Sequence, residues 1–206
     1  MLLYRYFHFF SLDIVLGAAA SGYLASYVLD VEMGFAWWLA LCLTVWILYL
    51  LDHWLDAKRF GEMSPRRLHK FIGHNSQFVL YIMLIAFVCD ILVIFLFLQR
   101  ELLLPGLVLG GFVMIIYLFR HIVKPGGFLR IPLEIFTMVF YVAGIWYGPL
   151  FINPTQSSIQ VYAILLQFGL MILMNIGILS YYDYPVDQML NVHDIHTALP
   201  FSFQGK

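Results

Sequence analysis

The chain has 206 residues, of which 63% are hydrophobic and 11% are charged. A soluble domain usually carries about 25% charged residues, so this composition excludes a water-soluble globule and predicts that lipid covers many apolar side chains. The net charge of −1 offers no electrostatic basis for binding nucleic acid. The apolar runs are continuous rather than short and alternating, which predicts helices instead of a transmembrane barrel.

These runs predict an all-α, polytopic membrane helix bundle with six transmembrane helices, in one domain over residues 1–206. Each run is near the roughly 20 residues that cross a hydrocarbon core. The expected helices are 9–29, 34–52, 77–98, 102–119, 131–151 and 158–182, with polar stretches at 57–76 and 183–206. We expect the first run to be a retained helix rather than a signal peptide, because Asp13 interrupts it.

Basic residues fall almost entirely on one side of the membrane if the six helices alternate. Only Arg100 falls on the other side. The ten that share one side are Arg5, Lys58, Arg59, Arg66, Arg67, Lys70, Arg120, Lys124, Arg130 and Lys206. The positive-inside rule then places both termini and both polar stretches in the cytoplasm. We therefore expect an integral, multi-pass protein of the plasma (inner) membrane.

Two acidic pairs of the same design end the second and sixth expected helices. Asp52 and Asp56 form the first pair and Asp183 and Asp187 the second, each within the pattern I-L-x-x-x-D-x-x-x-D. Residues four apart share one helix face, and like charges at the negative end of a helix dipole repel unless a cation compensates them. Carboxylate oxygens suit Mg²⁺, which commonly bridges carboxylates to phosphates. Marking the water interface is the alternative role for either pair alone.

Basic residues lie next to these pairs in the sequence. They are Arg59, Arg66 and Arg67 after the first pair, and Arg120 and Lys124 at the end of the fourth expected helix. Topology and contact with anionic lipid alone explain most such residues. Arginine also binds phosphate with two parallel hydrogen bonds. Acidic pairs beside basic loops, at the mouth of an apolar bundle, predict a site for a diphosphate with a lipid tail.

At this point the sequence resembles the UbiA superfamily of intramembrane prenyltransferases. Its two aspartate-rich motifs follow the second and sixth helices, as 52–59 and 183–187 do here. Ser64–Arg67 resembles a conserved loop segment of the family, and Tyr117–His121 its tyrosine-plus-basic pattern. The resemblance implies Mg²⁺-dependent transfer of an isoprenyl group from a prenyl diphosphate to an aromatic or other lipid-soluble acceptor. It assigns metal binding and catalysis to the four aspartates.

The chain also departs from the family pattern. Leu48-Tyr49 stands where the first motif commonly begins Asn-Asp, and Leu179 replaces an asparagine before the second motif. The family bundle has nine helices, and this chain carries six. The resemblance therefore leaves open a truncated or inactive relative, or a partner that supplies the remaining helices.

Other polar residues support different hypotheses. Asp13, Asp90 and Glu134 lie within or near apolar segments, where carboxylates are costly and indicate function. For Asp90 a proton or substrate role and a hydrogen bond between helices remain open. A zinc site at His193 and His196 is a weaker idea, because the pair lacks cysteine. A non-catalytic multi-pass protein, transporter-like or an assembly subunit, is the alternative function.

Overall fold

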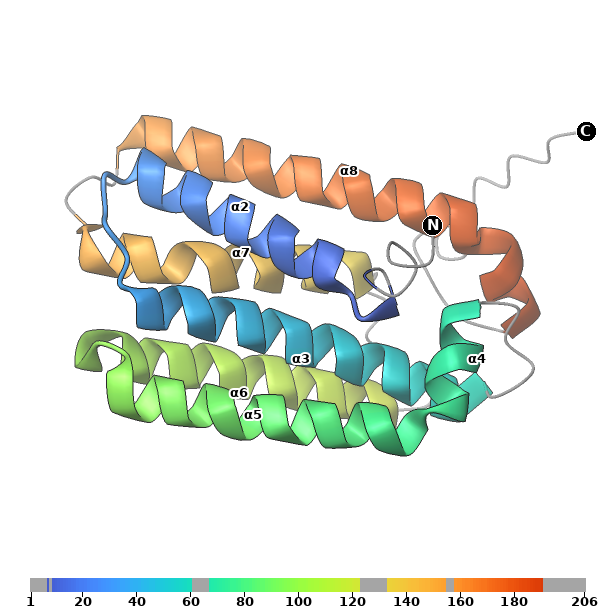
Figure 1. The fold of residues 1–206 in the computed structure, drawn as a ribbon. Helices are drawn as coiled ribbons and strands as arrows, with labels where there is room; N and C mark the ends of the chain where they lie inside the picture. Colours follow the sequence, from blue (N-terminus) through green and yellow to red (C-terminus); the bar gives the residue numbers. More distant parts are fainter. Residues whose placement is uncertain (1–6, 8, 61–66, 123–132, 155–157, 191–206) are drawn as a thin grey trace, which may run out of the picture. The chain divides into compact units, whose positions relative to one another are not determined.

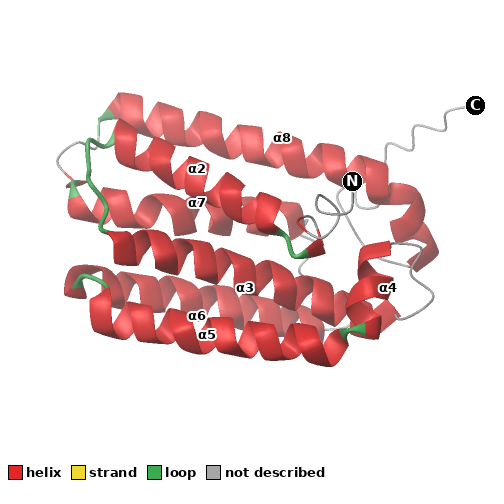
Figure 2. Cartoon of the chain, in the orientation of Figure 1, coloured by secondary structure: helices red, strands yellow, loops and turns green. Residues whose placement is uncertain are grey.

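A computed structural model describes residues 7, 9–60, 67–122, 133–154 and 158–190. For residues 59–60, 67, 116–122, 133–134 and 183–190 it describes the backbone alone. Within these ranges the regular secondary structure is helical and no strand occurs (Figure 1, Figure 2). The all-α prediction is confirmed for this part of the chain.

The chain divides into two compact units. Unit 1 comprises Met1–Leu104 and Ile145–Gln156, and unit 2 comprises Pro105–Gly144 and Ser157–Lys206. Two helices cross the division: α6 (Arg100–Ile122) and α7 (Leu133–Ile152).

Unit 1 is organised around α3 (Phe35–Phe60), which contacts α2 (Leu12–Val28), α4 (Arg67–His74) and α5 (Ser76–Phe97) (Figure 1). The long helices α2, α3 and α5 contain no proline, so their backbone hydrogen bonds continue without a break. A buried cluster joins α3, α4 and α5 through Ile47, Leu50, Ala57, Ile72, Val79, Met83 and Ala86. Apolar packing therefore continues to the polar end of α3.

The turn from α2 into α3 is fixed by several backbone contacts. Asp30 adopts a left-handed conformation with φ of 51°, which ends α2. Asn153 Nδ2, at the end of α7, donates to the carbonyl of Leu29 at 3.1 Å. Trp38 Nε1 donates to the carbonyl of Met33 at 3.2 Å, directly before α3. The bond from Asn153 satisfies a carbonyl at the C-terminal end of α2, where the last carbonyls have no partner within the helix. The bond from Trp38 holds the link between the two helices against the first turn of α3.

Unit 2 contains the later part of α6, the first part of α7 and α8 (Ile159–Leu190). Phe112 of α6 and Phe140 of α7 make an edge-to-face contact with centroids 5.8 Å apart. Gly169 of α8 faces Met138 and Val142 of α7, at ordinary contact distance for an added Cβ. α8 and α7 therefore pack at this point with room for one further carbon atom on Gly169.

Four helices are long and apolar enough to cross a membrane: Phe35–Lys58, Ser76–Phe97, Ile135–Ile152 and Ile159–Tyr182. Their outward side chains include large exposed hydrophobics such as Phe95, Leu96 and Met174. Such surfaces are unfavourable in water and indicate a membrane protein. Of the six membrane-spanning helices expected from the sequence, these four have the required length and apolar composition. Among the described residues, α2 is shorter, at 17 residues, and α6 is not one of the four.

Three details of the sequence prediction were wrong. The second helix does not end at 52 but continues to Phe60, and Ala57 in this extension belongs to the buried cluster that α3 shares with α4 and α5. The stretch 57–76 is not only a loop, since it contains α4. The last helix does not stop at 182, and α8 is helical through Pro185 to Leu190.

Candidate functional site

The first acidic pair lies near the end of α3. Asp52 and Asp56 are one helical turn apart in a continuous helix, and both side chains are half-buried. The shared helix face expected from their spacing is therefore present. Half-buried carboxylates keep part of their surface open to a ligand, while the neighbouring apolar cluster limits access to water.

Two histidines lie beside the acidic pair. His69 of α4 is only 2% exposed, and its ring centroid lies 6.4 Å from that of His53 on α3. The ring centroid of Tyr49, one turn earlier on α3, also lies 6.4 Å from that of His53. The row Tyr49–His53–His69 thus brings side chains that can form hydrogen bonds to the segment of α3 that carries the acidic pair. The sequence interpretation missed this row, although Leu68, His69 and Ile72 recur at the helical spacing that signals α4.

Trp54 holds the polar end of α3 against α5. Its indole Nε1 donates to the carbonyl of Ser76 at 3.0 Å, at the first residue of α5. Lys58 Nζ lies 5.4 Å from the centroid of the Trp54 ring, at cation–π distance. Trp46 Nε1 donates in the same way to the carbonyl of Phe10 at 2.8 Å. The backbone that carries the acidic pair is thereby tied to the elements on both sides.

The second acidic pair belongs to unit 2. The backbone at Asp183 and Asp187 is helical, in the last two turns of α8, and their side chains lie outside the described part. Their convergence with Asp52 and Asp56 on one site stays a prediction. Among the described residues, no three His, Cys, Asp or Glu side chains are grouped to hold a metal ion.

The predicted diphosphate-binding residues fall at the margin of the described part. Arg59, Arg67 and Arg120 have helical backbones in α3, α4 and α6, but their side chains lie outside it. Arg66 and Lys124 lie outside it altogether. Their contact with a diphosphate stays a prediction. The suggested zinc ligands, His193 and His196, likewise lie outside the described residues.

A second polar feature lies within the apolar length of unit 1. Thr44 Oγ1 of α3 donates to Asp90 Oδ2 of α5 at 2.8 Å. Asp90 is only 6% exposed, and its Oδ1 has no hydrogen-bond partner in the described part of the chain. The hydrogen bond between helices considered for Asp90 is thus present. Sequence reasoning found Asp90 but not Thr44, because the alignment of the two helices is not visible in either segment alone.

Comparison with family models, curated proteins and solved structures gives no match to this chain.

Proposed function

We propose that the chain is a UbiA-like prenyltransferase, which moves an isoprenyl group from a prenyl diphosphate to an aromatic or other lipid-soluble acceptor with Mg²⁺. The observation that carries the proposal is the placement of Asp52 and Asp56. They lie one turn apart and half-buried, where a membrane-length helix reaches its polar end. A diphosphate with an apolar tail needs such a boundary, with charge on one side and hydrocarbon on the other.

The chemistry of these side chains fits a hard divalent cation. Asp52 and Asp56 offer only oxygen ligands, and their partial exposure leaves room for waters and substrate oxygens, which Mg²⁺ usually keeps. Asp183 and Asp187 would supply the second half of the set. When bound, Mg²⁺ offsets the negative charge of the diphosphate.

The protein's own groups would hold and orient the substrate. Arg59, Arg66, Arg67, Arg120 and Lys124 are the proposed partners of the diphosphate oxygens. The allylic carbon–oxygen bond then breaks, diphosphate leaves with the electron pair, and the acceptor forms the new bond and loses a proton. Preorganised positive charge at the leaving group favours this step.

Binding of a prenyl diphosphate to the purified chain, with and without Mg²⁺, tests the proposal. Asp56→Asn keeps the shape of the side chain but removes a charge, so Mg²⁺-dependent binding should fall at least tenfold. Asp30→Asn is the matched control, because Asp30 is exposed in the turn at the other end of α3 and asparagine tolerates its left-handed backbone. Binding that ignores Mg²⁺, or that Asp56→Asn leaves unchanged, would contradict the proposal.

A second candidate, a non-catalytic multi-pass protein of the transporter-like or assembly kind, is favoured by Asp90. Within the described part of the chain, one oxygen of the buried Asp90 carboxyl has no hydrogen-bond partner. A carboxyl inside an apolar span costs free energy and frequently belongs to a transport path. Proton flux into proteoliposomes, followed with an internal pH dye, distinguishes the two. Flux that Asp90→Asn abolishes would favour this candidate, whereas absence of flux in the wild-type chain would count against transport.

A further inference from the structure

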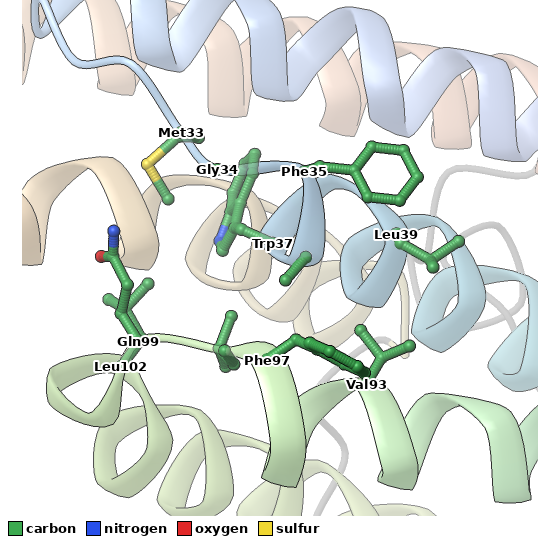
Figure 3. Close-up of a pocket in the computed structure, with 11 residues that line it drawn as sticks. Met33, Gly34, Phe35, Trp37, Leu39, Val93, Phe97, Gln99 and Leu102 are labelled. Carbon is green, nitrogen blue, oxygen red and sulfur yellow. The ribbon is translucent and has the colours of Figure 1, made fainter.

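Unit 1 contains a cavity far from the acidic pair. It has a volume of about 480 Å³ and lies between the start of α3, the end of α5 and the start of α6 (Figure 3). Its lining includes Phe35, Trp37, Leu39, Val93, Phe97 and Leu102. The volume lies within the roughly 300–1,000 Å³ of ligand sites, which are also mostly apolar.

The cavity lies at the end of two membrane-length segments. One segment begins at Phe35 and the other ends at Phe97, and both residues line the cavity. Gln99, in the link between α5 and α6, adds an amide to the lining. The cavity therefore opens at the level where hydrocarbon meets headgroups, and the neighbouring Trp37 and Trp38 are typical of that level.

Charges of both signs border this cavity along the chain. Glu32 directly precedes the lining residue Met33, and Arg100 and Glu101 directly follow Gln99. All three charged side chains are exposed. Arg100 is also the one basic residue that the sequence places on this side of the membrane. One cation beside two carboxylates complements a headgroup that carries both charges.

We infer that this cavity binds one acyl chain of a phosphatidylethanolamine-type lipid, with the phosphate at Arg100 and the ammonium at Glu32 or Glu101. An ammonium donates three hydrogen bonds to carboxylates, whereas a choline headgroup donates none. A glycerol headgroup leaves the lipid anionic and unfavourable beside two carboxylates. The inference is independent of the proposed function, because it uses none of the residues at the acidic end of α3.

Native mass spectrometry of the full chain in detergent tests the inference, with ethanolamine, choline and glycerol phospholipids that carry identical acyl chains. The wild-type chain should bind the ethanolamine lipid at least fivefold more tightly than the other two. Arg100→Gln should remove this preference. Equal affinity for the three headgroups would overturn the assignment.

Gly34→Leu tests whether the acyl chain occupies the cavity. Gly34 borders it, and an added Cβ would meet no atom within 4 Å, so the leucine can extend into the open space. Lipid affinity should fall at least tenfold, and Ala36→Leu, at another lining position, should have the same effect. Gly73→Leu is the matched control, because its surroundings on α4 are equally open. Wild-type affinity in both folded cavity variants would overturn the inference.

Discussion

Thr44 Oγ1 donates a 2.8 Å hydrogen bond to Asp90 Oδ2, which ties together α3 and α5 within their apolar length. Bonds of this kind between membrane helices contribute roughly 0.6 kcal/mol on average and up to about 1.7 kcal/mol. The bond is therefore modest in energy but specific in position, since it fixes the alignment of the two helices.

Thr44→Val should lower the free energy of unfolding by about 1 kcal/mol, because among the described residues it leaves both carboxyl oxygens of Asp90 without a donor. Unfolding in mixed micelles with increasing SDS measures the change. The control is the same substitution in a chain that already carries Asp90→Leu, where Thr44→Val should change the free energy of unfolding very little. Equal losses in the two backgrounds would mean that the bond contributes no coupling.

Gly148→Ala should destabilise unit 1. Gly148 is buried under the indole of Trp37, and an added Cβ would overlap Nε1 of that ring and press on Met33. Overpacking of this kind typically costs about 1–3 kcal/mol. Gly144→Ala is the control one turn earlier on α7, where an added Cβ meets nothing within 4 Å. Gly144→Ala should instead leave the free energy of unfolding unchanged or raise it slightly, because alanine has a higher helix propensity than glycine. An equal change in the free energy of unfolding for the two variants would contradict the close approach of Trp37 to Gly148.

Trp54→Phe should loosen the polar end of α3, because phenylalanine keeps the ring but leaves the carbonyl of Ser76 without its donor. The expected loss is about 0.5–1.5 kcal/mol. Lys58→Met removes the cation above the same ring and should cost less, since exposed cation–π pairs contribute about 0.5–1 kcal/mol. Hydrogen exchange at the start of α5 should increase in Trp54→Phe alone. Faster exchange in both variants would assign the effect to the ring contact.

Membrane orientation can be tested with single cysteines in a chain whose own Cys42 and Cys89 are replaced by alanine. The positive-inside bias predicts that Gly73→Cys faces the cytoplasm and Glu32→Cys the opposite side. Both positions are exposed and lie beyond opposite ends of α3. An impermeant thiol reagent should label only Glu32→Cys in intact cells. The reverse pattern would place the acidic end of α3 outside the cytoplasm.

The helices could be located from the sequence because long apolar runs have few other stable forms in a membrane. The start of α3 at Phe35 and the bounds of α5 lie within one residue of expectation. The end of α3 could not be located in the same way. Asp52 and Asp56 make the segment look like an interface, whereas Ala57 belongs to the same buried cluster as Ile72 of α4, which is consistent with a helix that continues past the acidic pair.

The candidate site was predictable in composition but not in its contacts. The i, i+4 spacing of Asp52 and Asp56 is a property of one helix and is visible in the sequence. The approach of His69 to His53 depends instead on how α4 folds back onto α3, which a segment of eight residues does not reveal by itself. The convergence of the two acidic pairs on one site depends on the packing of helices far apart in the sequence, and it stays a prediction.

The central position of α3 has a consequence for biosynthesis. Its partners α2, α4 and α5 are its neighbours along the chain, so most of its contacts span short sequence distances. Such contacts form quickly, and all of them are available once residue 97 has left the ribosome. α7 joins later. Asn153 then donates to the carbonyl of Leu29, and Gly148 packs against Trp37, so α7 docks on helices that are already assembled. We expect a nascent chain that is stalled once Phe97 has left the ribosome, but before α7 has left it, to protect α3 from protease.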